Sequence, residues 1–496
     1  MKGFQPDLRA GIRSRSPRAP RSLTLLLQSA LRGDPLRALA RPGGLAALAV
    51  TAIAALLSVQ AADGPWLAEL GRAIADRGGI PSGVPYASAP SAGWHNVPAL
   101  GELIFALLAT LGSRGAQLAQ VAAVAGTVTL LVRDARRSGA QEPALAVALL
   151  LLLPACFGPI VAIRAELFSL PLFAACVLLL RSEARAPSNR IWLLVPLLAL
   201  WGNLHGAVLT GAAVAGAYLI FERARSRPGE SVAVMAAGAL ALCANPALWH
   251  TPSYVLGVLH NQAAEQAIGL WAPLSVHSWL DVAFALAALV LIAGALRARP
   301  RPRGWELVAM AGLALLTLHA ARGGVWLALF AAPLAAAGFG GAPGSRPIPR
   351  LARPLALVLV AAVLLGVVHG PLPSGAGAPL VSRTIALAHG TPVLAEDLLA
   401  EQVAGAGGRV WVANPIDAFR QADQRVYVEW LRGVRAGDAA LAHAPRAVLV
   451  RRDGKAERRL RADAAFRAVA SDRGAVLYAR VATASSSGGA VPMGDS

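Results

Sequence analysis

Cysteine and charged residues are scarce in this 496-residue chain, and each shortage excludes a class of protein. The three cysteines, Cys156, Cys176 and Cys243, stand in apolar segments without disulfide or zinc-site spacing, which argues against a disulfide scaffold and a cysteine zinc site. Only 15% of the residues are charged, whereas 56% are hydrophobic and the mean hydropathy is +0.55. A water-soluble globule cannot bury that much apolar surface. The composition therefore indicates a polytopic membrane protein.

Acidic residues are also few, since 46 Lys and Arg stand against 27 Asp and Glu. The arrangement of the basic residues does not favour a nucleic-acid partner, because they form short arginine clusters between apolar runs, and lysine occurs only at Lys2 and Lys455. Clusters of this kind orient membrane proteins. Segment 1–42 holds Lys2 and eight arginines, and we interpret it as a cytoplasmic basic tail that also meets the anionic headgroups of the lipid bilayer.

Apolar runs long enough to approach the roughly 20 residues of a membrane span follow this tail. Eleven are predicted, at 43–62, 116–132, 143–162, 166–181, 191–205, 206–221, 231–247, 279–296, 305–321, 323–340 and 354–370. The run 97–113 is expected to lie in the interface or to re-enter, because only then do the later arginine clusters fall on the side of the tail. That side then carries 25 Lys and Arg, against five in the outer loops before residue 371. This predicts a multi-pass plasma-membrane protein with a transmembrane domain over 43–370, a cytoplasmic N-terminus and an extracytoplasmic C-terminal segment.

Polar residues that stand out from apolar surroundings collect at the outer ends of these spans. They are Asp63, Arg164 and Glu166 in AIRAELFS, Asn203 and His205 in LWGNLHGAV, Asn245 in CANPALWH, and Arg322 in LHAARGGVW. Each alone has a structural explanation, such as a helix cap, an ion pair or a side chain that reaches the headgroups. Together they predict a functional cavity on the outer side, because ionisable groups near lipid are costly unless they line water or a ligand site.

The outer loop 63–115 carries the most specific pattern, an aspartate directly after the first span followed by a long loop with interfacial helices, of which 67–75 is expected to be one. It resembles the GT-C superfamily of membrane glycosyltransferases, which includes the dolichyl-phosphate-mannose protein mannosyltransferases and their bacterial relatives. The resemblance covers roughly 43–340. The matching residues are Asp63, Trp66, Gly71, Arg72, Ile74, Gly79, Pro81, Trp94 and Glu102, then Trp201, Asn203, His205, Gly206, Asn245 and Pro246.

The resemblance implies transfer of a sugar from a polyprenyl-phosphate carrier to an acceptor of the cell envelope. Asp63 would act as the general base on the acceptor hydroxyl. Arg164 and Arg322 would balance the leaving phosphate, since guanidinium groups match phosphate oxygens. The implied substrate-binding set is completed by Glu166, Asn203, His205, Asn245 and Glu102. Glu102 could also help to bind a divalent cation, but such a cation needs several oxygen ligands and few can be named, so metal dependence stays open.

Three departures from the family pattern concern the chemistry more than the fold. Gly64 and Pro65 follow Asp63 where many relatives have a second acidic residue or a histidine, the segment VPA at 97–99 replaces His-Glu-Trp, and Leu270 stands before Trp271 where a glutamate is expected. Because of these departures, a catalytically inactive scaffold is one alternative to an active glycosyltransferase. A transporter or flippase with an outward cavity is the other, although transporters tend to have repeated halves and polar groups at the bilayer midplane.

The last part of the chain changes character. Segment 371–480 alternates extended and helical patterns, with strands expected in GRVWVANP, APRAVLVRR and GAVLYAR and helices at about 393–405, 417–434 and 461–470. Segment 481–496 is expected to be a disordered tail. The predicted fold class is therefore an α-helical polytopic membrane protein, GT-C-like with about 11 transmembrane helices, with a small C-terminal extracytoplasmic α/β domain.

Overall fold

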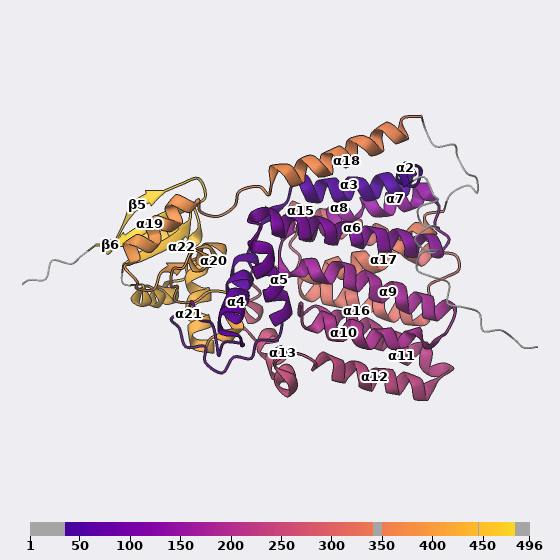
Figure 1. Ribbon diagram of the computed structural model, residues 1–496, viewed down its shortest axis with the longest axis horizontal. Helices are drawn as coiled ribbons and strands as arrows, with labels where there is room; N and C mark the ends of the chain where they lie inside the picture. Colours follow the sequence, from indigo (N-terminus) through magenta and orange to yellow (C-terminus); the bar gives the residue numbers. More distant parts are fainter. Residues whose placement is uncertain (1–34, 341–349, 445, 482–496) are drawn as a thin grey trace, which may run out of the picture.

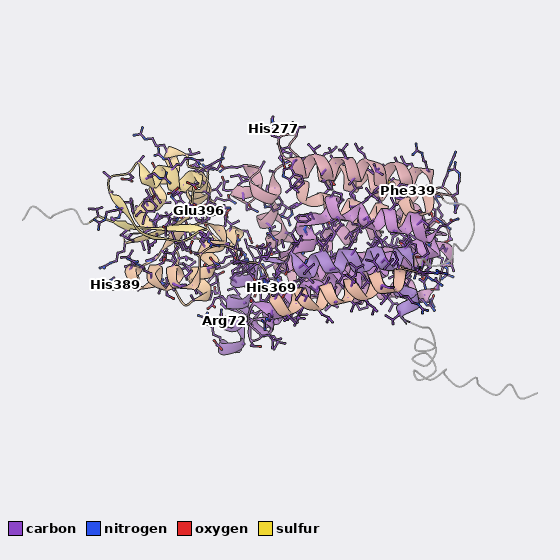
Figure 2. All side chains as sticks on the ribbon, turned by 90° about the horizontal axis from the view of Figure 1, so that it is seen from above. Arg72, His277, Phe339, His369, His389 and Glu396 are labelled. Atoms are coloured by element: carbon purple, nitrogen blue, oxygen red, sulfur yellow. The ribbon has the colours of Figure 1, made fainter. Side chains whose placement is uncertain are left out.

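Long apolar helices run side by side along one axis, and an α/β domain stands against one end of this bundle (Figure 1). The structure is a computed structural model that describes residues 35–340, 350–444 and 446–481. Most of the predicted basic tail and disordered tail lies outside these residues. We call the end that meets the α/β domain the capped end. In Figure 2, His277 and His369 lie at this end and Phe339 lies at the opposite end.

The bundle contains a helix, or a bent pair of helices, at each predicted span. These helices are α3 (Pro42–Leu56), α6 (Ser113–Arg137), α7 (Glu142–Leu150), α8 (Leu152–Val161), α9 (Ser169–Arg185), α10 (Leu194–Gly202), α11 (Val208–Phe221), α12 (Pro228–Leu242), α15 (Trp279–Arg297), α16 (Gly304–His319), α17 (Gly324–Gly338) and α18 (Ala352–His369). Among the described residues, five helices are long and apolar enough to cross a membrane, and six if the α7–α8 pair, bent by 53°, is one span. The count of eleven spans therefore stays a prediction.

Helix α17 forms the centre of the bundle, because almost all of its side chains are buried. Its Trp326 packs against Phe173 of α9 with ring centroids 5.2 Å apart, and its Phe330 meets Trp305 of α16 edge to face. By contrast, α15 and α18 expose leucine and valine side chains on their outer faces, for example Leu289 and Leu365. An apolar centre with an equally apolar outside is what a bundle surrounded by lipid requires.

The exposed tryptophans mark both ends of the bundle. Trp192 lies near the start of α10, whereas Trp249 and Trp279 are 76% and 77% exposed at the capped end. Exposed tryptophans favour the two interfaces of a bilayer. Helices α4 (Gly64–Arg77) and α5 (Ala99–Ala109) lie across the capped end (Figure 1), as expected for interfacial helices in the outer loop. They pack closely at Gly71, where a Cβ atom would come within 2.1 Å of the Glu102 carbonyl oxygen.

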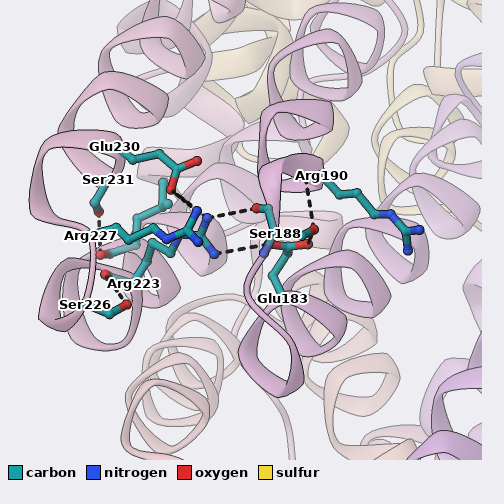
Figure 3. Close-up of polar contacts among 9 residues, drawn as sticks. Glu183, Ser188, Arg190, Arg223, Ser226, Arg227, Glu230 and Ser231 are labelled. Carbon is teal, nitrogen blue, oxygen red and sulfur yellow. Dashed lines mark hydrogen bonds and ion pairs between the residues drawn. The ribbon is translucent and has the colours of Figure 1, made fainter. Parts of the chain in front are cut away.

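Two of the predicted topogenic arginines are buried and paired. Arg223 is 1% exposed, and its guanidinium donates to Glu183 at 3.1 Å, to Glu230 at 2.7 Å and to the Ser188 carbonyl at 2.8 Å (Figure 3). Arg181 pairs with Asp134 and Glu306 in the same way. Both networks lie toward the opposite end, where α6, α9 and α15 also finish in arginines. These two arginines tie helices together, so the positive-inside argument depends on the remaining, exposed ones.

The shorter elements lie in the bundle, at its capped end and in the C-terminal domain. They are α2 (Pro35–Leu39), α13 (Thr251–Leu259), α14 (Gln262–Glu265) and the 3-10 turns η1 (Ala165–Phe168), η2 (Asn189–Leu193), η3 (Arg223–Arg225), η4 (Leu248–His250), η5 (Gly269–Trp271), η6 (Ala321–Gly323), η7 (Ile416–Ala418) and η8 (Arg435–His443). Two-residue strands β1 (Val59–Gln60) and β2 (Ala162–Ile163) pair in parallel at the capped end.

The C-terminal domain contains a four-stranded sheet in the order β3-β4-β6-β5, parallel only between β3 and β4. Its strands are β3 (Leu394–Ala395), β4 (Ala447–Arg451), β5 (Phe466–Ser471) and β6 (Ala475–Arg480), and its helices are α19 (Ala378–Ala388), α20 (Asp397–Gly405), α21 (Gln421–Leu431) and α22 (Lys455–Arg461). The predicted class, a small α/β domain, is confirmed.

Two predicted elements of this domain differ from the structure, and one helix was not predicted. The segment 461–470 was expected to be helical, but most of it is strand β5, because the Asp472 carboxylate accepts the Gly474 and Ala475 amide hydrogens and turns the chain into a hairpin. The predicted strand GRVWVANP forms only isolated bridges, at Val410. Helix α19 was not predicted.

Candidate active site

The paired strands β1 and β2 bring Asp63 and Arg164 together. Val59 and Gln60 pair with Ala162 and Ile163, so the chain segments that follow both strands leave the capped end side by side. Asp63 comes three residues after β1 and Arg164 directly after β2. Two residues that are 101 positions apart in the sequence thereby become neighbours at the end of the bundle.

The Asp63 carboxylate forms an ion pair with Arg164 and remains partly open to solvent. Its Oδ2 accepts hydrogen bonds from Arg164 Nε at 2.9 Å and Nη2 at 2.5 Å, and the Trp66 indole N–H lies 3.4 Å from Oδ1. The two side chains are 22% and 23% exposed. Oδ1 therefore keeps lone-pair capacity for a further donor.

The backbone of Asp63 is held in an unusual conformation by the C-terminal domain. Its φ angle is +95°, a region that costs a non-glycine residue about 1–3 kcal/mol unless its surroundings impose it. The Asp63 N–H donates to both carboxyl oxygens of Glu401 in α20, at 2.8 and 3.1 Å. The Asn414 side-chain amide donates to the same carboxyl group at 2.7 Å. Glu401 and Asn414 thus hold Asp63 in place from the far part of the sequence.

Glu401 is completely buried, and it is the acidic neighbour of Asp63 that sequence reasoning missed. Burial raises the pKa of this carboxyl well above its usual range, and the nearby Asp63 charge raises it further. Its only sequence signal is a glutamate on the buried face of a helix, 338 residues after Asp63. Such a signal indicates packing and does not reveal the partner.

Arg164 belongs to a group of charged side chains that also includes Glu166 and Arg322. Electrostatic interactions connect Arg322 with Glu166, Arg164 and Asp63. The Arg322 side chain is exposed, and its guanidinium lies over the Trp271 ring at 4.4 Å. No hydrogen bond joins it to any residue that the structure describes. The group holds two arginines and two carboxylates, but Arg322 has no carboxylate in direct contact among the described residues, so its guanidinium can contact an anionic ligand.

His205 presents a neutral ring with a defined tautomer. The Ser169 hydroxyl accepts the Trp201 indole N–H at 2.7 Å and lies 2.8 Å from His205 Nδ1, which accepts the Ala207 backbone N–H at 3.4 Å. Because Nδ1 accepts, the ring hydrogen lies on Nε2. Electrostatic interactions connect His205 with Arg322 and Arg164. His205 is thus a neutral hydrogen-bond donor near both arginines.

Asn203 and Asn245 also lie at the capped end, but their side-chain amides hold helix ends. The Asn203 amide donates to the carbonyls of Ala199 and Ala244, which joins the ends of α10 and α12. Asn245 donates to the Leu242 carbonyl and accepts the Ala247 N–H, which caps the chain turn after α12. The structure brings neither amide into the Asp63 cluster by a hydrogen bond, and we leave both out of the substrate contacts proposed below.

Glu102 lies apart from this cluster, fully buried at the start of α5. It accepts a hydrogen bond from the Asn96 side-chain amide at 2.5 Å, and burial raises its pKa to about 8. A carboxyl that stays protonated near neutral pH is a poor ligand for a divalent cation. Within the described residues, no group of three His, Cys, Asp or Glu side chains could hold a metal ion. The residues described do not fit a divalent cation at Glu102.

The capped end contains a cavity of about 410 Å³. It lies between the outer loop around Trp94, helix α13 and the segment 417–420 of the C-terminal domain. The Asp63, Arg164, Glu166, Arg322 and His205 side chains are not among its lining residues. The charged cluster and this cavity are therefore two separate features of the same end.

Comparison with known proteins identifies relatives by structure only. No family model matches the chain, and no curated protein matches its sequence. Among solved structures, the arabinofuranosyltransferase AftD from Mycobacteria, in a mutant form, aligns with 90% of this chain at a TM-score of 0.50 and 16% identity. The aligned region spans 42% of the AftD chain.

ArnT from Cupriavidus metallidurans aligns in two states. Its apo structure covers 92% of this chain and 97% of its own, with a TM-score of 0.49 and 13% identity. Its structure bound to undecaprenyl phosphate covers 93% and 98%, with a TM-score of 0.47 and 15% identity. AftD and ArnT are GT-C membrane glycosyltransferases. The likeness to AftD shows that this chain has the GT-C fold and confirms the predicted fold class, a polytopic membrane protein with a small C-terminal α/β domain.

Proposed function

We propose that this chain is a glycosyltransferase of the plasma membrane that transfers a sugar from a polyprenyl-phosphate carrier to a cell-envelope acceptor. The observation that carries the proposal is the geometry of Asp63, whose partly exposed carboxylate pairs with Arg164 and whose backbone N–H is held by Glu401. A fold shared with an arabinofuranosyltransferase supports it and disfavours a transporter or flippase. Asp63, Arg164, His205 and Arg322 all lie at the capped end, next to the C-terminal domain.

The reaction assigns one role to the carboxylate. An acceptor hydroxyl attacks the anomeric carbon of the donor sugar, and the bond from that carbon to the phosphate oxygen breaks. Asp63 Oδ1, which has only a long contact with Trp66, takes the hydroxyl proton. The electron pair of the broken bond leaves with the carrier phosphate. Arg164 orients Asp63 through its other oxygen, Oδ2.

The leaving phosphate gains negative charge, which positioned donors can stabilise. Arg322 is the main candidate, because its exposed guanidinium contacts no carboxylate directly while interacting with Glu166 over a longer distance. Arg164 adds positive charge next to Asp63. The Nε2 hydrogen of His205 supplies a neutral donor beside them. Glu166 interacts electrostatically with both arginines.

The membrane orientation is part of the proposal. Exposed arginines gather at the opposite end, which favours placing that end in the cytoplasm. The capped end, with the charged cluster and the C-terminal domain, is then extracytoplasmic. Cysteine or reporter labelling of intact cells should reach residues near His389 in the C-terminal domain and should not reach Phe339.

The deciding experiment compares two carboxylates of the same loop in a deletion strain. Asp63→Asn keeps the shape of the side chain and removes the base, whereas Asp76→Asn changes an exposed aspartate at the far end of α4. Lipid-linked sugars are extracted and measured by mass spectrometry at matched membrane levels of the variants. The Asn variant at residue 63 should accumulate polyprenyl-phosphate sugar like the deletion, and the control should restore turnover. Normal turnover in Asp63→Asn would remove the catalytic assignment and favour an inactive scaffold.

A further inference from the structure

The cavity at the capped end has a lining that the Asp63 chemistry does not use. Its volume of about 410 Å³ falls in the range of about 300–1,000 Å³ typical of small-molecule sites. Three separate parts of the chain contribute its walls. The side chains that matter for the argument are Trp94, His95, Tyr254, Asp417, Phe419 and Arg420. We call this space the aromatic cavity.

The aromatic cavity combines flat apolar faces with charged groups of both signs. Trp94 and Tyr254 lie with ring centroids 6.3 Å apart and planes tilted by 56°, so they form two walls at an angle. The Trp94 indole N–H donates to Asp417 Oδ2 at 2.9 Å, which orients the ring and leaves Asp417 Oδ1 without a side-chain donor among the described residues. Arg420 is exposed at the start of α21.

This combination matches the chemistry of a carbohydrate better than that of a lipid tail. The C–H faces of a sugar ring are apolar and pack on aromatic rings, while its hydroxyl groups need acceptors such as a carboxylate and donors such as a guanidinium. A lipid tail would cover Asp417 Oδ1 without offering it a hydrogen-bond donor, which is costly. The lining therefore selects a ligand that is both ring-shaped and rich in hydroxyl groups.

The aromatic cavity is joined to the charged cluster by a short chain segment. Asn414, which donates to Glu401 beside Asp63, stands three residues before Asp417. The Tyr86 hydroxyl donates to the Asn414 carbonyl at 2.6 Å and fixes this segment against the outer loop. On the other wall, Asn96 follows His95 directly and holds Glu102. A ligand in the cavity thus lies against the segment whose Asn414 holds Glu401 beside Asp63.

We propose that the aromatic cavity binds a carbohydrate and that, resting on the proposed glycosyl transfer, it holds sugar residues of the acceptor. The acceptor class is then a glycan, with Trp94 and Tyr254 packing on a ring and with Asp417 and Arg420 contacting its hydroxyl groups. The donor's phosphate belongs to the arginine cluster, so the proposal assigns donor and acceptor to separate parts of the capped end.

The test measures sugar binding without requiring catalysis. The full chain is reconstituted in lipid nanodiscs, because maltoside detergents would occupy a sugar site. Saturation-transfer NMR is recorded with the methyl glycosides of glucose, galactose, mannose and arabinose. Wild-type protein should transfer magnetisation to at least one glycoside, and Trp94→Ala and Arg420→Ala should reduce the signal at least fivefold. Trp192→Ala, a partly exposed tryptophan at the opposite end, is the matched control and should leave it unchanged.

Two outcomes would overturn the assignment: no transfer to any of the four glycosides in wild-type protein, or equal transfer in wild-type, Trp94→Ala and Arg420→Ala. Arg420→Ala removes an exposed side chain, so its result stands even if the Trp94 variant fails to fold. Asp63→Asn should bind glycosides as the wild type does. Normal binding together with unaltered turnover in Asp63→Asn would refute the proposed catalysis and leave the carbohydrate site standing.

Discussion

Replacing Glu102 by glutamine should remove a loss of folding stability that the wild-type protein suffers as the pH rises. Glu102 is fully buried and has a pKa of about 8, against 4.5 for an ordinary glutamate. Its Oε1 and the Asn96 Oδ1 are both buried without a partner among the described residues, while Glu102 Oε2 accepts the Asn96 amide. A proton on Oε1 supplies the donor that the Asn96 oxygen lacks. Glutamine carries such a donor at every pH.

The direction and the magnitude of this pH effect on stability follow from the protons that the folded and unfolded states bind. Between the unfolded pKa of 4.5 and the folded pKa of about 8, the folded state holds a proton that the unfolded state has lost, so stability falls as the pH rises. Integrating between pH 5 and pH 8 gives a loss of about 3–4 kcal/mol for the wild type. A chain of this size should lose about 1–2 °C of melting temperature per kcal/mol. From pH 5 to pH 8, the melting temperature of the wild type should therefore fall by roughly 4–7 °C more than that of Glu102→Gln.

The assay is thermal unfolding in nanodiscs at pH 5, 6, 7 and 8, followed by intrinsic fluorescence. Comparing wild type with Glu102→Gln cancels the other titrating groups. Glu69→Gln, a half-exposed glutamate of α4 paired with Arg72, is the matched control and should follow the wild-type pH dependence. A difference between wild type and Glu102→Gln that stays constant from pH 5 to pH 8 would refute the neutral, buried state of Glu102.

Three further predictions concern the charged groups. His205→Gln, which keeps a neutral N–H donor, should retain more transfer activity than His205→Ala, because the proposed role of His205 is to donate its Nε2 hydrogen beside the two arginines. Glu401→Ala should lower the transfer rate about 100-fold by releasing Asp63, measured at matched protein levels. Arg223→Met should destabilise the bundle by about 3–5 kcal/mol in thermal unfolding, and adding Glu183→Met should recover most of that loss, since it removes the unpaired buried charge.

The features that depend on local sequence could be predicted. Hydropathy predicted the helices of the bundle, and polar residues at the ends of apolar runs predicted which charged residues gather at one end. The apolar runs coincide with helices because a backbone in lipid must satisfy its own hydrogen bonds. The position of Asp63, Arg164 and Arg322 at one end follows from alternating helix directions. The α5 segment was expected in the interface because of charge distribution alone, and it lies across the capped end.

Partners far apart in the sequence could not be predicted in the same way. The Asp63–Arg164 pair depends on two two-residue strands, which are too short to leave a pattern. Glu401 depends on how the C-terminal domain packs against α4. For Asn203 the predicted ligand contact stays a prediction, and the structure shows a role that the sequence did not indicate, since its amide donates to backbone carbonyls at two helix ends. A polar residue in an apolar run indicates that its side chain has a partner. The sequence does not say which residue that partner is.

The contacts of Asp63 give the C-terminal domain a role beyond covering the bundle. The family pattern leads one to expect an acidic or imidazole neighbour next to Asp63 in the sequence, and this chain has Gly64 and Pro65 there. Glu401 supplies a carboxyl group at that point from α20, and it contacts the Asp63 N–H rather than its side chain. A contact to the backbone cannot share the proton-transfer work of the Asp63 carboxylate, but it can hold the +95° φ angle that aims it. Because Asn414 and Asp417 follow on the same domain, any displacement of the domain should disturb the base and the aromatic cavity together.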